Sequence, residues 1–262
     1  MDFDAESLRL RLAGRRIGCR LHFLPTVDST NRVALGFAQE GAPEGTVVLA
    51  DRQTAGRGRM DRRWQSPPDC NLYLSLLLRP VIAPADAPQI TLVAGVAVAE
   101  TLSLICPAGV GLKWPNDVMI RGRKVCGILT EMRMAETAVE AVVVGIGLNV
   151  NMAEEDFDPT LRDAATSLRR ETGRTHSREE AAALLCERFE RWYDIFRSRG
   201  FHPVREGWLA RSDMPGKRVR IRFLKEVTEG VVKGIDRDGA LLLEDDHGAL
   251  RRITAGDASI VK

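Results

Sequence analysis

The spacing of apolar residues changes near Met214, and this change constrains the fold more than any other feature of the sequence. Before it, apolar runs of strand length are interspersed with longer segments that have helical spacing. After it, five short apolar runs are separated by turn sequences. Short strands with regular turns are typical of a small antiparallel barrel. We therefore predict a first domain of strands and helices over residues 1–214 and a small β-barrel over residues 215–262.

Apolar periodicity and capping residues give the expected elements of the first domain. Strands are predicted at 20–24, 46–50, 71–78, 110–113, 118–120, 124–131 and 139–150. Helices are predicted at 5–13, between the cap sequence 28–31 and Gly41, after Asp86, and at 159–168, 178–196 and 203–211. In the second domain, strands are expected at 219–223, 230–235, 240–244, 249–254 and 258–261.

The balance of positive and negative charges argues against a dedicated nucleic-acid-binding protein. The chain has 38 basic and 36 acidic residues and a formal net charge of +2, whereas a dedicated nucleic-acid binder usually presents a strongly basic face.

Five cysteines without a Cys-x-x-Cys pair and four scattered histidines predict reduced thiols and no metal site. The first residues are unlike a signal peptide, and no apolar run reaches the roughly 20 residues of a membrane span. We therefore expect a cytoplasmic protein with no membrane segment.

The densest group of candidate site residues lies between Gln53 and Trp64, a segment that we call the arginine loop. It contains four arginines and two glycines within residues 56–63. Guanidinium groups bind phosphate or carboxylate with paired donors, and glycines let the backbone approach a ligand closely. The loop has neither the Walker pattern nor the dinucleotide fingerprint. It therefore indicates an anion site of another kind, with a solvated basic loop as the alternative.

Three shorter segments are further candidates. Lys113 ends an apolar strand, where a lysine is costly unless it meets an anion. Asn149 follows two glycines late in an apolar strand, and such glycines suggest that something packs against the backbone. The cap sequence 28–31 has more polar residues than capping needs, so its free N–H groups are candidates to hold a polar ligand. A strand end, a bulge and a plain cap are the respective alternatives.

Taken in order, these segments resemble those of the biotin protein ligase family. The matching sequences are Asp-Ser-Thr-Asn at 28–31, Gln-Thr-Ala-Gly-Arg-Gly-Arg at 53–59, Trp-x-Ser-Pro at 64–67, Asn-Leu-Tyr-Leu-Ser at 71–75, Lys-Trp-Pro-Asn-Asp at 113–117, Lys-Val-Cys-Gly-Ile-Leu at 124–129, Gly-Ile-Gly-Leu-Asn at 145–149 and Ala-Thr-Ser-Leu at 165–168. The resemblance implies an α+β catalytic domain related to class II aminoacyl-tRNA synthetases, in which helices back a mixed sheet. An SH3-like barrel is implied to follow it.

The same resemblance implies a reaction in two steps. Biotin and ATP, with Mg²⁺ bridging the phosphates, would give biotinyl-5′-adenylate and pyrophosphate. A lysine of a biotin carboxyl carrier protein domain would then take the biotin.

The resemblance also carries roles over to individual positions. It implies that Lys113 lies at the reacting carboxylate and α-phosphate, and that Arg57 and Arg59 are further catalytic groups that offset the repulsion between two anions. Contacts with biotin are implied for Ser29, Thr30, Asn31, Gln53, Arg57, Gly58, Arg59 and Lys113. Contacts with ATP or the adenylate are implied for Gly56, Arg57, Arg59, Arg62, Trp64, Asn116 and Asn149.

The sequence departs from the family pattern in two places. Asp61 stands where the arginine loop of the family usually has a later glycine, which adds charge and removes backbone freedom. No winged-helix domain precedes the catalytic segments, so we expect no operator binding and no role as a repressor.

Other functions and assemblies are compatible with part of this pattern. The alternatives are a lipoate or octanoate ligase of the same superfamily, whose usual Arg-Arg-x-Ser-Gly-Gly-Gly segment is absent, a biotin-sensing DNA-binding repressor, and a biotin-binding module without catalysis. Both a monomer and a homodimer are compatible with the sequence.

Overall fold

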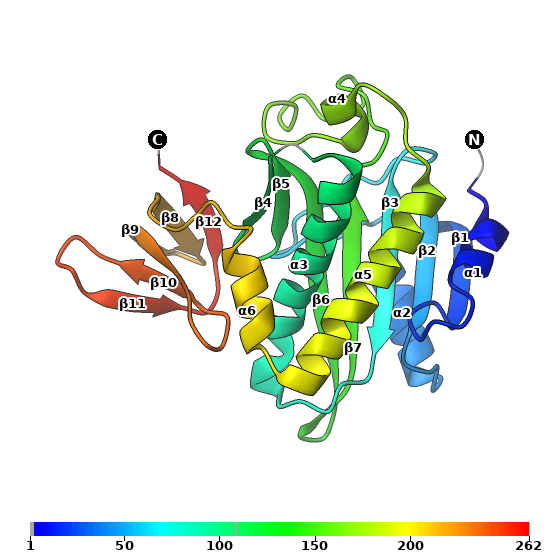
Figure 1. Ribbon diagram of the computed structural model, residues 1–262, viewed down its shortest axis with the longest axis horizontal. Helices are drawn as coiled ribbons and strands as arrows, with labels where there is room; N and C mark the ends of the chain where they lie inside the picture. The colour runs from blue at the N-terminus through cyan, green and yellow to red at the C-terminus, as the bar shows by residue number, and fades with distance from the viewer. Residues whose placement is uncertain (1–2, 108, 262) are drawn as a thin grey trace.

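The computed structural model describes residues 3–107 and 109–261, and Figure 1 shows how their elements are arranged. A large sheet forms the body of the molecule. Helices α3 (Ala87–Ile105) and α5 (Arg178–Arg199) cross one face of it, and α2 (Thr30–Gln39) covers the other. A smaller sheet lies beside this body, at the C-terminal end of the chain.

Seven strands form the large sheet in the order β1-β2-β3-β7-β6-β5-β4. β1 and β2 are parallel, and every other neighbouring pair is antiparallel, so the sheet is mixed. Because helices cover both faces, the central strand β3 is almost entirely apolar, and each of its residues is buried. The strands are β1 (Arg20–Val27), β2 (Thr46–Gln53), β3 (Leu72–Leu78), β4 (Val110–Lys113), β5 (Asp117–Ile120), β6 (Arg123–Ala135) and β7 (Ala138–Leu148).

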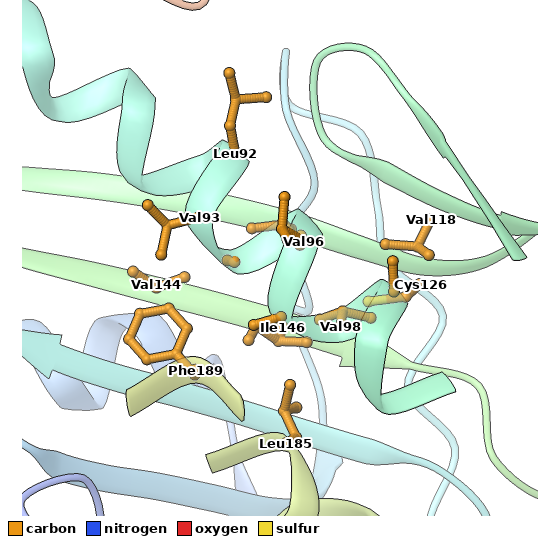
Figure 2. Packing of buried hydrophobic residues seen from close by; sticks show 14 of the residues in the cluster. Leu92, Val93, Val96, Val98, Val118, Cys126, Val144, Ile146, Leu185 and Phe189 are labelled. Carbon is orange, nitrogen blue, oxygen red and sulfur yellow. The ribbon is translucent and has the colours of Figure 1, made fainter. Parts of the chain in front are cut away.

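The two faces of the sheet are separated by the alternation of side chains along each strand. Val144 and Ile146 of β7 point toward α3 and α5, where they pack with Val93 and Phe189 (Figure 2). Val143, which directly precedes Val144 in the sequence, belongs to the smaller apolar cluster under α2. This alternation fixes the register of β7, because a shift by one residue would exchange the two clusters.

Helix α3 corrects one expectation drawn from the sequence. The segment Pro84–Ile105 has a mean hydropathy of 1.5 and is long and apolar enough to cross a membrane, so the statement that no apolar run reaches that length was wrong. Of the most apolar 18 residues of this segment, 67% is buried inside the protein. A helix that is covered on most sides must be apolar around most of its circumference. Burial in the core therefore explains the apolar character of this segment.

The second sheet is antiparallel, as predicted, with the strand order β11-β10-β9-β8-β12. It packs against the first domain, and its Val219, Ile221 and Leu241 belong to the main apolar core. Closure into an SH3-like barrel and a domain boundary near Met214 stay predictions. The strands are β8 (Arg218–Phe223), β9 (Glu226–Ile235), β10 (Leu241–Glu244), β11 (Leu250–Ile253) and β12 (Asp257–Ile260).

The remaining helices are short, and one of them differs from the expectation. Helices α1 (Ala5–Arg11) and α6 (His202–Leu209) lie where the sequence places them. The predicted helix over 159–168 is wrong, because only α4 (Leu168–Thr172) is helical. The backbone of Lys124 accepts a hydrogen bond from Thr166 and donates one to the carbonyl of Ala164, each at 2.8 Å. The first part of the segment, residues 159–164, forms turns, and the pairing with Lys124 holds Ala165 and Thr166 beside β6.

Candidate active site

A cavity of about 310 Å³ lies between the arginine loop and the glycine-containing parts of β6 and β7. Its other walls come from the start of α2, the segment 161–165 and Asp257 of the second sheet. The cavity brings together most of the residues that were predicted from the sequence. Those that line it are Ser29, Thr30, Asn31, Gln53, Arg57, Gly58, Arg59, Arg62, Trp64, Asn116 and Asn149.

Lys113 does not line this cavity, and Lys124 does. Both lysines face the carboxylate of Asp117: Lys124 Nζ lies 2.5 Å from one oxygen and Lys113 Nζ lies 3.9 Å from the other. The prediction that Lys113 lies at the reacting groups is therefore corrected: the lysine in the wall of this cavity is Lys124. The sequence signal for Lys124 was present, since it opens the segment 124–129 that matches the family, but the strand-end argument favoured Lys113.

Gly56 also lies outside the cavity lining. A Cβ atom at this position would come within 2.6 Å of both Ser66 Oγ and the carbonyl oxygen of Trp64. The glycine is therefore required by close packing within the arginine loop. Its contact with the nucleotide stays a prediction.

The start of α2 is held by a chain of hydrogen bonds. The backbone N–H of Thr30 donates to Gln53 Oε1 at 2.9 Å, and Gln53 Nε2 donates to Ser66 Oγ at 3.0 Å. Ser75 Oγ donates to Asn31 Oδ1 at 2.6 Å. Ser29 is the N-cap residue, but its side chain makes no capping hydrogen bond. Its hydroxyl and the fixed amide of Gln53 can therefore serve a polar ligand.

Glu131 connects this group to the arginine loop. Its carboxylate accepts hydrogen bonds from Arg57 Nη2 at 2.8 and 3.0 Å and from Asn31 Nδ2 at 2.7 Å. The carboxylate thus fixes a cationic side chain and an amide that both line the cavity. Sequence reasoning missed this residue, because a glutamate at the end of a predicted strand is ordinarily a solvated side chain.

Asp257 of β12 holds the other end of the arginine loop. Arg59 Nη1 donates to the carbonyl of Gly256 at 3.2 Å and lies 3.5 Å from the Asp257 carboxylate, and Arg62 also pairs with that carboxylate. Burial lowers the pKa of Arg59, while the carboxylates of Asp257 and Asp117 oppose this effect. The second sheet therefore supplies the counter-charge that positions two loop arginines.

Three glycines shape the floor of the cavity. Cβ atoms at Gly127 and Gly147 would lie 2.9 and 2.5 Å from the Trp64 indole, and one at Gly145 would lie 2.2 Å from Asn31 Oδ1. The expectation that something packs against Gly145 and Gly147 is confirmed, because Asn31 and Trp64 do so. Lys124 Nζ lies 5.4 Å from the centre of the Trp64 ring, within cation–π range.

Asn149 has a structural partner at the end of β7. It is 5% exposed, and its Nδ2 donates to the carbonyl of Thr166 at 3.0 Å. The neighbouring Val150 N–H donates to Asn71 Oδ1 at 2.9 Å. The bond to Thr166 fixes the direction of the Asn149 amide where it borders the cavity, and the bond to Asn71 holds the backbone beside it.

The tip of the arginine loop has a backbone conformation that favours glycine. Met60 and Asp61 have φ values of 54° and 58°, in the left-handed region that favours glycine. The tight turn around them is closed by the N–H of Gly58, which donates to the carbonyl of Arg62 at 2.6 Å. Asp61 therefore has a backbone conformation that glycine would adopt without strain.

The cavity lining carries more positive than negative charge. Its lining contains four arginines and Lys124, against two carboxylates, those of Asp117 and Asp257. Within residues 3–107 and 109–261, no cluster of three or more His, Cys, Asp or Glu side chains could hold a metal ion. Burial raises the pKa of the nearby Cys126 thiol, which therefore stays protonated. The arrangement suits two anions that must be brought together, and it offers no cysteine nucleophile.

Comparison with known proteins agrees with this geometry. The family described as "Biotin/lipoate A/B protein ligase family" matches residues 23–149, and "Biotin protein ligase C terminal domain" matches residues 216–261. The chain is 39% identical over 257 residues to the bifunctional ligase/repressor BirA of Bacillus subtilis, a match that covers 97% of this chain and 78% of that protein. It is 39% identical over 230 residues to the biotin--[acetyl-CoA-carboxylase] ligase of Paracoccus denitrificans, with 86% and 94% covered.

A solved structure extends the similarity to the whole fold. The biotin protein ligase from Aquifex aeolicus in complex with biotin and ATP superposes with a TM-score of 0.79 at 30% identity, covering 93% of this chain and 99% of that one. Sequence matches over both domains and the superposition agree with the cavity described above. The chain belongs to the biotin protein ligase family.

Proposed function

We propose that the chain is an ATP-dependent biotin protein ligase. In the first step, a carboxylate oxygen of biotin attacks the α-phosphorus of ATP, the bond to the bridging oxygen breaks, and pyrophosphate leaves. In the second step, the neutral amine of an acceptor lysine attacks the anhydride carbonyl carbon. The C–N bond forms, the C–O bond to AMP breaks, and the proton of the amine passes to water.

The observation that carries this proposal is the concentration of cationic side chains at one cavity. A carboxylate and a polyphosphate repel each other, and charge develops on the α-phosphate oxygens as they react. Arg57, Arg59 and Lys124 are fixed donors that stabilise this charge without reorganising. Lys124 takes the role first assigned to Lys113, because it is the lysine at the cavity wall.

The two ends of the cavity suit the two substrates. The polar residues at the start of α2, together with Gln53, bind the biotin end, with Arg57, Gly58 and Arg59 on both substrates. The nucleotide end lies toward Arg62, Trp64, Asn116 and Asn149. The Trp64 indole offers a flat surface for an adenine base, and the fixed amide of Asn149 lies nearby.

Mg²⁺ enters this scheme as part of its substrate, MgATP. The two carboxylates of the cavity are already paired, Asp117 with Lys124 and Asp257 with two arginines. They do not make a resident metal site, so no step is assigned to a protein-bound ion. The phosphates themselves supply the oxygen ligands that Mg²⁺ prefers.

The acceptor is a lysine of a biotin carboxyl carrier protein domain, which is supported by relatives named biotin--[acetyl-CoA-carboxylase] ligase. The cytoplasm suits this role, and the five cysteines are free thiols. The test is incubation of the purified protein with MgATP, a carrier domain, and biotin, lipoate or octanoate in parallel. Mass spectrometry should find one biotinylated lysine and no lipoyl or octanoyl product. A lipoylated carrier without biotinylation would contradict the proposal.

A further inference from the structure

A second cavity, of about 390 Å³, lies beside the first. It is enclosed by the start of α3, β6, the segment 114–116 and the turns of the second sheet. It shares Arg59, Asn116, Ile128 and Leu129 with the first cavity. The same side chains therefore border both spaces, and a group bound in the second cavity lies next to whatever reacts in the first.

The surface of the second cavity is mainly apolar. Pro84, Ala85, Leu92, Trp114 and Met132 provide much of its wall, and Ala85 and Met132 are exposed at the surface. An apolar hollow that reaches the surface favours an apolar ligand over a polyanion.

The polar groups in this wall are largely paired with one another. Thr91 Oγ1 donates to Thr130 Oγ1 at 2.9 Å, and Trp114 Nε1 donates to the carbonyl of Gly239 at 3.1 Å. Arg252 is bound by the carboxylates of Asp236 and Asp238. These groups satisfy each other, which leaves the apolar surface as the main feature available to a ligand.

The acceptor lysine can reach the first cavity only if the residues on either side of it in the acceptor protein also come close to that cavity. Its four-carbon stem places the amine about 6 Å from its Cα atom, so the neighbouring residues must lie close to the reacting carbonyl. A hollow next to the reaction cavity is the place where they can lie. The second cavity shares a wall with that cavity, and part of its own wall lies at the surface.

We propose that the second cavity binds the segment of the acceptor protein that flanks the modified lysine, with apolar side chains of that segment in the hollow. This inference rests on the proposed ligase function. It assigns the second cavity to the transfer step alone, because biotin and ATP are held in the first cavity.

The test separates the two half-reactions with variants that alter only the second cavity. Met132→Glu places a charge in its wall, and Ala85→Trp fills it. Met134→Glu, two residues farther along β6, and Ala83→Trp, at the start of the short 3-10 helix Pro84–Asp86 that holds Ala85, are the matched controls. Neither Met134 nor Ala83 lines the cavity, and both are exposed. Each protein is assayed for biotin-dependent ATP–pyrophosphate exchange, transfer to a purified carrier domain, and reaction of the bound adenylate with hydroxylamine.

Met132→Glu and Ala85→Trp should lower kcat/KM for the carrier domain at least tenfold. Exchange and the reaction with hydroxylamine, a nucleophile too small to need the second cavity, should stay within about twofold of the unchanged protein. Transfer that is unaffected in both variants would overturn the inference. An equal loss of exchange and transfer would place the second cavity in the first half-reaction and also overturn it. Absence of exchange in the unchanged protein would contradict the ligase function instead.

Discussion

Replacing Lys124 by Gln tests which of the two lysines that face Asp117 acts in adenylate formation. Gln retains most of the length of the lysine side chain but carries no charge. Lys124 lines the cavity and its side chain is 31% exposed, so it is partly screened by solvent. A preorganised donor at developing charge contributes about 2.7–4 kcal/mol. Allowing for the screening, we expect a loss of about 2–3 kcal/mol, which slows adenylate formation about 30- to 150-fold.

The same change at Lys113 is the matched control. Its Nζ lies 3.9 Å from Asp117, and its side chain is 26% exposed. A partly exposed pair at this distance contributes at most about 1 kcal/mol, so Lys113→Gln should slow adenylate formation less than about fivefold.

The assay is the rate of biotin-dependent ATP–pyrophosphate exchange, with biotin binding measured separately. The Lys124 variant should lose rate far more than affinity for biotin, because its charge matters most in the transition state. Equal losses in the two variants, or a larger loss at Lys113, would refute the assignment. A thermal midpoint close to that of the unchanged protein confirms that each variant is folded.

Three further substitutions test other parts of the site. Glu131→Gln should lower kcat/KM for exchange about 5- to 30-fold, because Arg57 loses charge-assisted bonds of about 1–2 kcal/mol in total; Glu140→Gln, which affects a pair outside the cavity, should have no such effect. Gly147→Ala should displace the Trp64 indole, whose nearest atoms would lie 2.5 Å from the new Cβ, and should change the tryptophan fluorescence and reduce exchange. Asp61→Gly should leave the thermal midpoint within about 3 °C, since relief of about 1 kcal/mol of strain is offset by about 0.5–1 kcal/mol of added chain entropy; a larger shift would contradict this balance.

Residues in contiguous motifs could be placed from the sequence. The arginine loop, the start of α2 and the glycines of β7 each combine an unusual composition with a strand or helix boundary. Arg57, Trp64 and Asn31 therefore reach the predicted site. Local sequence carries this information because the side chains act close to the backbone that positions them.

Other features depend on contacts between distant segments. The choice between Lys113 and Lys124 depends on which strand, β4 or β6, brings its lysine to the cavity wall, and the apolar pattern does not encode that. Glu131 becomes important only because the arginine loop passes over β6. The expected helix at 159–168 gives way to turns and to backbone pairing with Lys124, and the close packing of Gly56 against Ser66 also comes from contacts that the local pattern does not encode.

The most direct test of the central claim is ATP–pyrophosphate exchange by the purified protein, measured with biotin present and absent. The account predicts that labelled pyrophosphate enters ATP only when biotin and Mg²⁺ are both present, because the first step is reversible and needs the biotin carboxylate. Exchange that is independent of biotin, or no exchange in a folded protein that binds biotin and ATP, would contradict it.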